Sequence, residues 1–274
     1  MYCSQELINL SLKKLVLSKG SYLKKHIEQL KEEGLLSQRP SRKINISPQM
    51  KSEFEEGKLL LLDKPIHWTS FDVVKKLRGA IRIKKVGHAG TLDPLASGLL
   101  IICTGKFTKK INEYMAQKKK YTGSFTLGAV TPTYDLESTP EQQKDISHLT
   151  DSQIIEATHS FIGEIDQMPP IYSAIKVEGK HLYELARRGK DVELKARKIT
   201  IDDFEITKIE WPQVDFRIVC STGTYIRSIA NDFGSLLGCG AYLSALRRTA
   251  IGEFKVDDAV SVDDFLESID EANN

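Results

Sequence analysis

The residues best suited to chemistry lie in one short stretch, residues 87–98, where glycine, alanine and proline surround a single carboxylate, Asp93. Small residues allow a tight backbone with little side-chain bulk. Apolar Leu92 and Leu95 flank Asp93, so the carboxylate could be desolvated and act as a nucleophile or a base. An aspartate before a proline also starts turns, so an Asx turn with a purely structural role is the other interpretation.

His88, in the same stretch, could be a structural hydrogen-bonding group or could contact a phosphate or a base. The glycines suggest a phosphate loop, but the chain contains neither G-x-x-x-x-G-K-[ST] nor G-x-G-x-x-G. The four cysteines are far apart and form no C-x-x-C, which argues against a metal cluster or a disulfide framework. A reducing cytoplasm suits this cysteine usage.

Length and composition predict an ordinary globular protein. The 274 residues, 41% of them apolar, are enough for a stable core. No run approaches the roughly 18 apolar residues of a membrane span. The apolar stretch at 7–17 is interrupted by Asn9, Lys13 and Lys14, so we expect no signal peptide and a cytoplasmic location.

Charge is distributed unevenly along the chain. Residues 58–135 carry 14 basic and 5 acidic residues, a net charge of +9, whereas residues 250–274 carry 1 basic and 8 acidic residues, a net charge of −7. A basic excess of this size suits the phosphate backbone of RNA or DNA, although any one cluster could be a solvated helix face. The basic clusters lie at 75–78, 82–85, 109–110 and 118–120.

The apolar patterns predict strands and helices that do not alternate regularly, which indicates an α+β fold. Thr69 or Ser70 can cap a helix that would carry Phe71, Val74, Leu77 and Ile81 on one face. We expect strands at 59–62, 99–104, 121–127, 199–209 and 214–220, and further helices at 106–116, 151–162, 181–188 and 224–237.

Three segments differ in character. Residues 1–57 predict an arm of two amphipathic helices, at 7–17 and 22–36, followed by a polar linker at 38–57. We expect residues 58–254 to form the main domain. Residues 255–274 predict an acidic tail that aids solubility.

Residues 87–100, which read G-H-A-G-T-L-D-P-L-A-S-G-L-L, closely resemble the catalytic motif of TruB-type tRNA pseudouridine synthases. Further blocks resemble other motifs of this family, in the family's order, between residues 59 and 254. One short motif would be weak, but an ordered set is highly specific. These blocks are 60–65 with 68–70, 120–121 with 127–128, 167–176, 179–187, 221–228 and 246–249.

The resemblance implies a pseudouridine-synthase fold, with a mixed, largely antiparallel sheet flanked by helices. It implies an isomerase that converts uridine 55 in the TΨC loop of tRNA to pseudouridine after the base flips out of its stack. The reaction involves neither a redox change nor phosphate cleavage, so no cofactor and no metal are expected. The expected partner is the T stem-loop of tRNA, with no membrane and no obligatory protein partner.

By the resemblance, Asp93 is the catalytic aspartate, which would attack the ribose or take up a proton from it. Tyr121 matches the tyrosine that stacks on the target base. Tyr225 and Arg227 match an active-site tyrosine and arginine, and a guanidinium beside Asp93 would keep the carboxylate ionised.

Three further residues match family positions near the substrate. Leu246 matches an apolar pocket residue, Lys64 a lysine with a structural or charge-positioning role, and His88 a histidine that shapes the RNA. Without the resemblance, Leu246 would be read as plain core packing.

The chain departs from many family members in two ways. Only about 20 residues follow Phe254, and this segment is acidic, so we expect no C-terminal RNA-binding domain of the PUA type. The arm at 1–57 is not part of the family pattern. The alternatives are an RNA-binding module without catalysis, a guide-RNA-dependent synthase, which needs the PUA domain, and an aspartate-dependent glycosidase. A glycosidase needs a second carboxylate, and the sequence indicates none.

Overall fold

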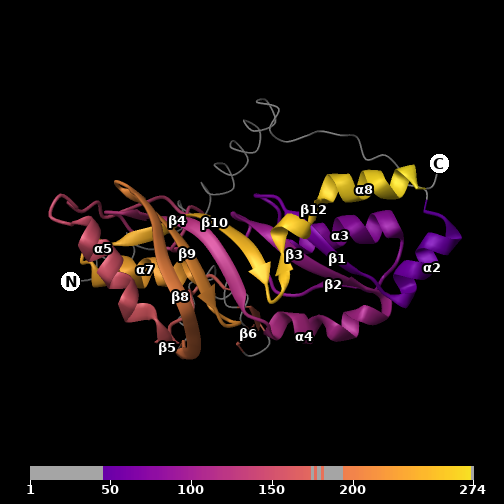
Figure 1. Cartoon of the computed structure of the whole chain (residues 1–274), viewed down its shortest axis with the longest axis horizontal. Coiled ribbons are helices and arrows are strands. Elements are labelled where there is room, and N and C mark those ends of the chain that lie inside the picture. The colour runs from indigo at the N-terminus through magenta and orange to yellow at the C-terminus, as the bar shows by residue number, and fades with distance from the viewer. Residues whose placement is uncertain (1–45, 174–175, 178–179, 182–193, 273–274) are drawn as a thin grey trace, which may run out of the picture. The chain divides into compact units, whose positions relative to one another are not determined.

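The computed structural model describes residues 46–173, 176–177, 180–181 and 194–272 (Figure 1). The chain divides into two compact units, Met1–Lys43 and Ile44–Asn274, and all described residues belong to the second. The helices predicted at 7–17 and 22–36, and nearly all of the one predicted at 181–188, lie outside the described residues.

One long sheet organises the second unit, and it confirms the α+β prediction. Its main path runs β12-β1-β3-β10-β4-β9-β8-β5, with β2 and β11 attached to β3 and β10. Only the β1–β12 and β3–β10 pairs are parallel. The strands are β1 (Leu59–Lys64), β2 (Val86–His88), β3 (Ala96–Thr104), β4 (Lys119–Leu127), β5 (Gly163–Gln167), β8 (Arg197–Glu210), β9 (Gln213–Cys220), β10 (Ala241–Ile251), β11 (Phe254–Lys255) and β12 (Val260–Ser261), with β6 (Lys176–Val177) and β7 (Lys180–His181) forming a separate pair.

Helices flank this sheet, and none in the described part of the chain has the length and apolar character needed to cross a membrane. The α-helices are α2 (Pro48–Glu56), α3 (Ser70–Ile81), α4 (Ile111–Ala116), α5 (Asp151–Ala157), α7 (Ile226–Leu236) and α8 (Val262–Glu271). The 3₁₀ helices are η1 (Gly105–Lys110), η2 (Thr158–Phe161) and η3 (Val256–Asp258).

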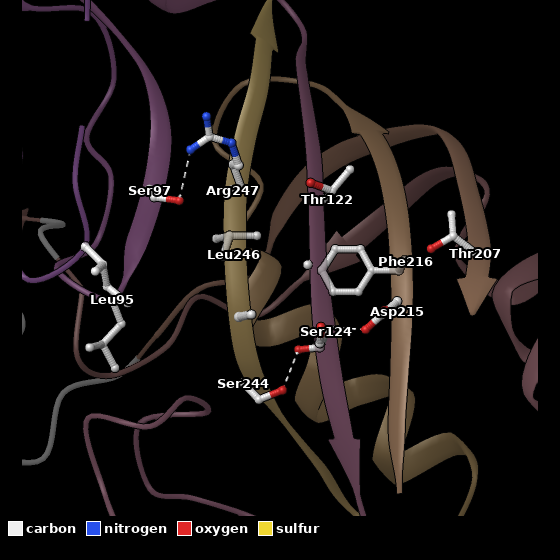
Figure 2. Close-up of a pocket in the computed structure, with 13 residues that line it drawn as sticks. Leu95, Ser97, Thr122, Ser124, Thr207, Asp215, Phe216, Ser244, Leu246 and Arg247 are labelled. Carbon is white, nitrogen blue, oxygen red and sulfur yellow. Dashed lines mark hydrogen bonds between the residues drawn. The ribbon is translucent and has the colours of Figure 1, made fainter. Parts of the chain in front are cut away.

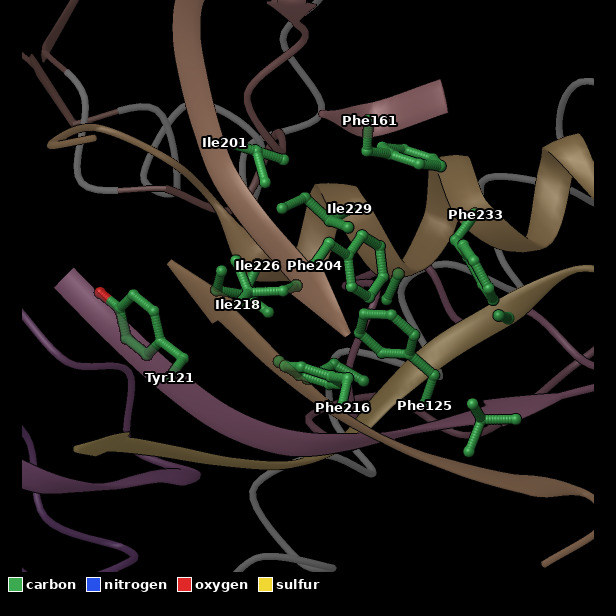
Figure 3. Packing of buried hydrophobic residues seen from close by; sticks show 14 of the residues in the cluster. Tyr121, Phe125, Phe161, Ile201, Phe204, Phe216, Ile218, Ile226, Ile229 and Phe233 are labelled. Atoms are coloured by element: carbon green, nitrogen blue, oxygen red, sulfur yellow. The ribbon is translucent and has the colours of Figure 1, made fainter. Parts of the chain in front are cut away.

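The largest core packs α5, η2 and α7 against strands β4, β8, β9 and β10. Phe125 is at its centre, with its ring centroid 4.2 Å from that of Phe216 and 5.7 Å from that of Phe233. Tyr121 lies at the edge of this cluster, further along β4 (Figure 3). The core therefore fixes both α7 and β4, which carry predicted site residues.

A second core packs α2, α3 and α8 against β1 and β3. Helix α3 begins at a capping box, in which the Thr69 hydroxyl accepts from the Asp72 backbone N–H and the Asp72 carboxylate accepts from that of Thr69. The helix ends at Arg82, which has a left-handed conformation with φ of 52°. Because α3 starts at the edge of the Gly-rich loop, its cap fixes one side of the candidate site.

The structure corrects three predictions at the ends and surface of the domain. Residues 48–56 form α2, whose Phe54 is buried, so the linker predicted at 38–57 is wrong there. Residues 262–271 form α8 instead of a tail, because apolar residues recur at helical spacing among the acidic ones. Phe71, predicted on the buried face of α3, is 58% exposed.

We expect Phe265→Ala to lower the free energy of unfolding by about 3 kcal/mol, because it removes a buried aromatic ring from between α8 and α2. Glu271→Ala, on the exposed end of the same helix, should change it by less than about 0.5 kcal/mol. Chemical denaturation measures both. Equal effects of the two substitutions would mean that α8 is not part of the core.

Candidate active site

A buried arginine on β10 holds the loop that carries Asp93. Arg248 is only 1% exposed, and its Nε and Nη2 donate to the carbonyls of Leu99 and Gly90 at 2.8 and 3.1 Å. Gly98 has φ of +103°, and a Cβ there would lie 2.3 Å from the Arg248 carbonyl oxygen. The loop can pass this close to β10 only because residue 98 is glycine.

The segment before α3 holds the loop from a second direction. The Ser70 hydroxyl accepts from the Leu92 N–H at 2.8 Å and donates to the Leu92 carbonyl at 3.2 Å, and the His67 N–H donates to the Pro94 carbonyl at 2.7 Å. Lys64 is fully buried and donates to the carbonyls of Pro65 and Trp68 at 2.9 and 2.6 Å. Burial lowers the pKa of the Lys64 amine to about 8.

These anchors place Asp93 against Arg227 at the start of α7. Arg227 Nε lies 2.8 Å from Asp93 Oδ2 and 3.5 Å from Asp135 Oδ2. The Nε–H does not point along either contact as a hydrogen bond would, so both are ion pairs held by charge. Burial raises the pKa of Asp135, and the charge of Arg227 opposes that rise.

The arginine itself is fixed by the backbone. Arg227 is 5% exposed, and its Nη1 and Nη2 donate to the carbonyls of Thr133 and Tyr172, each at 3.1 Å. Burial alone would lower its pKa, but the charges of Asp93 and Asp135 outweigh burial and raise it. The guanidinium is therefore a permanent positive charge beside Asp93, whose side chain remains 36% exposed.

Two hollows meet at Leu95 and Leu246. The one that Asp93 and Asp135 line is only about 10 Å³, room for about one water molecule. The other is an open groove of about 400 Å³ that Ser97, Thr122 and Ser244 also line (Figure 2). Because Leu95 and Leu246 line both, a pyrimidine that entered from the groove would reach Asp93 only after these side chains moved.

The structure brings some predicted residues together and separates others. Asp93 and Arg227 are in contact, and Leu246 lines the same small cavity as Asp93. Tyr225 is the N-cap of α7, and its backbone N–H donates to Gln167 Oε1 at 2.8 Å. Burial raises the pKa of its hydroxyl.

Tyr121 and His88 lie near Arg248 and line neither hollow. Tyr121 is 8% exposed within the core; burial raises the pKa of its hydroxyl and Arg248 acts to lower it. Burial, and then the charge of Arg248, lower the pKa of His88. Tyr121 is paired with Arg248 across β4 and β10, whereas His88 ends β2 at the start of the loop itself.

Sequence reasoning missed two functional candidates. Arg248 lies in the block at 246–249 that resembles a family motif, and membership of that block was the available signal. Asp135 lies in a long polar connection with no local signal, and only the fold brings it to Arg227. Within the described ranges, no three His, Cys, Asp or Glu side chains are placed to share a metal ion.

Comparison with protein families identifies the chain's relatives. Residues 78–226 match the model of the TruB family pseudouridylate synthase N-terminal domain, and residues 227–274 match the tRNA pseudouridylate synthase B C-terminal domain. A Flavobacterium johnsoniae protein named tRNA pseudouridine synthase B is 53% identical over 79% of this chain and 98% of the relative. One of that name from Chlorobaculum tepidum is 51% identical over 80% and 93%. This chain belongs to the TruB family.

Solved structures agree with this assignment. A Cbf5–Nop10–Gar1 complex contains a chain with 29% identity and a TM-score of 0.63, over 84% of this chain. An H/ACA RNP bound to a substrate RNA containing 2′-deoxyuridine gives 26% identity and a TM-score of 0.60. This chain spans about 60% of the length of each of these two larger chains. The shared part includes most of the TruB-family domain described above.

The buried amine of Lys64 predicts a pH dependence of stability. In the unfolded chain a lysine keeps its proton up to about pH 10.5, whereas in the folded protein Lys64 loses it near pH 8. Raising the pH through this window should therefore stabilise the wild-type protein relative to Lys64→Met.

Urea unfolding at several pH values measures this difference. Subtracting the variant removes the opposite contribution of Cys103 and Cys220, whose pKa values burial raises to about 11. Lys119→Met is a matched comparison that should show the same pH dependence. Burial also lowers the pKa of Lys119 to about 8, and its amine also donates to backbone carbonyls. A difference that does not change with pH would contradict the depressed pKa of Lys64.

Proposed function

We propose that this chain isomerises uridine 55 in the T stem-loop of tRNA to pseudouridine, in the cytoplasm. The observation that carries the proposal is the Asp93–Arg227 ion pair in a TruB-family chain, with Asp93 on a loop that Arg248 and Ser70 anchor. The relatives named tRNA pseudouridine synthase B support tRNA as the substrate.

In the proposed reaction, the bond between ribose C1′ and uracil N1 breaks, the uracil rotates, and a bond forms between C1′ and C5. The proton on C5 is released and N1 gains one, so the product is an isomer of the substrate. Asp93 acts as the carboxylate that attacks the ribose or accepts its proton. Arg227 pairs with the Asp93 carboxylate, and Asp135 balances the charge of the arginine.

The remaining residues hold the base. Leu246 gives the everted uracil an apolar contact, and Tyr225 borders it from the start of α7. Tyr121 stacks on the base once the surrounding side chains have moved, a contact of about 1–3 kcal/mol. His88 shapes the neighbouring RNA, and Lys64 positions charge and backbone behind Asp93. Eversion of the base costs a few kcal/mol, which contacts from the basic segment offset.

Asp93→Asn should abolish turnover and leave tRNA affinity within about threefold, because the amide keeps the shape but loses the charge. Tritium release from tRNA that contains 5-tritiated uridine measures turnover, and filter binding measures affinity. Asp202→Asn, which removes an exposed carboxylate paired with Lys118, should leave both unchanged. Near-normal release by Asp93→Asn would exclude Asp93 from the mechanism, and no release by the wild-type protein would indicate a binding module.

Tyr121→Phe keeps the aromatic face and should bind tRNA with nearly wild-type affinity, whereas Tyr121→Leu loses the face and should bind at least fivefold more weakly. Both variants stay apolar at a core position, and thermal unfolding checks that they fold. A collapse of affinity in Tyr121→Phe would mean that the hydroxyl, not the ring, makes the contact.

A further inference from the structure

One flank of α3 is basic, exposed and adjacent to the Asp93 loop. Residues four and three positions apart share a face of a helix, so the side chains at 71, 75 and 78 form a single stripe, and Arg82 follows them at the C-cap. All four are exposed: Phe71, Lys75, Arg78 and Arg82. We call this stripe, together with exposed Lys84 and Lys85 just beyond it, the α3 flank.

The start of the flank lies at the candidate site. Ser70, the residue before Phe71, bonds in both directions to the backbone of Leu92, the residue before Asp93. Phe71 is 58% exposed, and the Arg78 guanidinium carbon lies 5.9 Å from the centre of its ring. From Phe71 to Arg82 the helix advances about 16 Å away from this point.

The flank faces the loop and not the acidic C-terminal helix. Arg78 Nη2 donates to the carbonyl of Val86 in β2 at 2.6 Å, which places the stripe beside the strand that leads into the Asp93 loop. Helix α8 follows β12, and β12 pairs with β1. Strand β1 lies on one side of β3, and β2 and β10 lie on the other. In Figure 1, α8 runs along the other side of α3.

Few negative charges offset this surface. Between residues 71 and 110 the chain has nine basic residues and two acidic ones, Asp72 and Asp93. The Asp72 carboxylate accepts from Thr69 in the helix cap, and that of Asp93 pairs with Arg227. The Gly105 N–H donates to the Lys85 carbonyl, so η1, with exposed Lys109 and Lys110, continues the positive surface, while Lys106 pairs with Glu56 at 2.7 Å.

We propose that the α3 flank binds the RNA stem that adjoins the target loop. Lys75, Lys84 and Lys85 contact successive phosphates, and Phe71 packs against the nucleotide nearest Asp93. Phosphate contacts fix the register of a nucleic acid on a protein without reading its sequence. Side chains have little access to the bases of an A-form stem, so such contacts suit this part of the substrate. The inference rests on the proposed function and specifies which part of the tRNA this surface holds.

A triple charge reversal tests the proposal: Lys75→Glu, Lys84→Glu and Lys85→Glu. We expect KM and Kd for unmodified tRNA to rise roughly tenfold or more, with kcat at saturating tRNA within twofold. The slope of log affinity against log salt should fall by about 0.7–0.9 for each phosphate that the variant no longer neutralises. Phe71→Ala should weaken binding at least fivefold with little change in this slope.

The matched control reverses three exposed lysines elsewhere, Lys198→Glu, Lys208→Glu and Lys255→Glu, and so changes the net charge by the same amount. Unchanged affinity in the α3 variant, or equal weakening in the control, would overturn the proposal. The isolated T stem-loop should show the same loss as full-length tRNA; a loss confined to full-length tRNA would assign the flank to another part of the RNA and overturn it as well. Binding is measured without turnover, so an inactive wild-type protein would refute the proposed function and leave this test in force.

Discussion

The candidate site depends on one buried cation whose hydrogen bonds go to backbone carbonyls. Burying a guanidinium costs several kcal/mol unless its donors are satisfied. Arg248 meets this condition through the carbonyls of Leu99 and Gly90, at the two ends of the segment that contains Asp93. That segment is rich in glycine and alanine and has little apolar surface to bury. Its shape therefore comes from polar contacts with β10 and α3, and not from packing of its own side chains.

The charge of Arg248 also affects the residues around it. Burial is the main cause that lowers the pKa values of Lys64, Lys119 and His88, and the charge of Arg248 lowers them further. Arg227 has the opposite surroundings, because it lies between two carboxylates, Asp93 and Asp135. One arginine thus holds the backbone of the loop, while the other pairs with the carboxylate that the loop presents.

The sequence predicts those elements whose local pattern of capping and apolar residues matches the structure. The helix at 70–81 shows its cap and its apolar spacing in the sequence, and β8 and β9 show clear alternation. The central strand β10 was missed because bulges at Leu243/Ala245 and Arg248/Ala250 break its alternation and because it turns an arginine inward. Helix α8 was missed because its apolar residues are hidden among acidic ones.

The candidate site was predictable only in part, for a related reason. Asp93 and Arg227 lie in recognisable motifs, and the structure places them in contact. Asp135 depends on long-range contacts, since an isolated bridge between Asp135 and Leu243 brings its segment beside β10. Phe71 shows the reverse case, in which an apolar residue at the edge of a helical face was predicted inside and is exposed. Periodicity cannot separate these cases, because the flank of a helix is buried or exposed according to which neighbour covers it.

The site combines a rigid polar part with apolar side chains that can yield. The carbonyl contacts of Arg248 and Ser70 fix the backbone on both sides of Asp93. Leu95 and Leu246, which separate the small cavity from the groove, are half-buried and make no polar contact that would hold them. Rotating two leucine side chains costs far less than breaking a buried hydrogen-bond network. Movement of these two leucines would thus enlarge the small cavity while the Asp93 carboxylate stays in place.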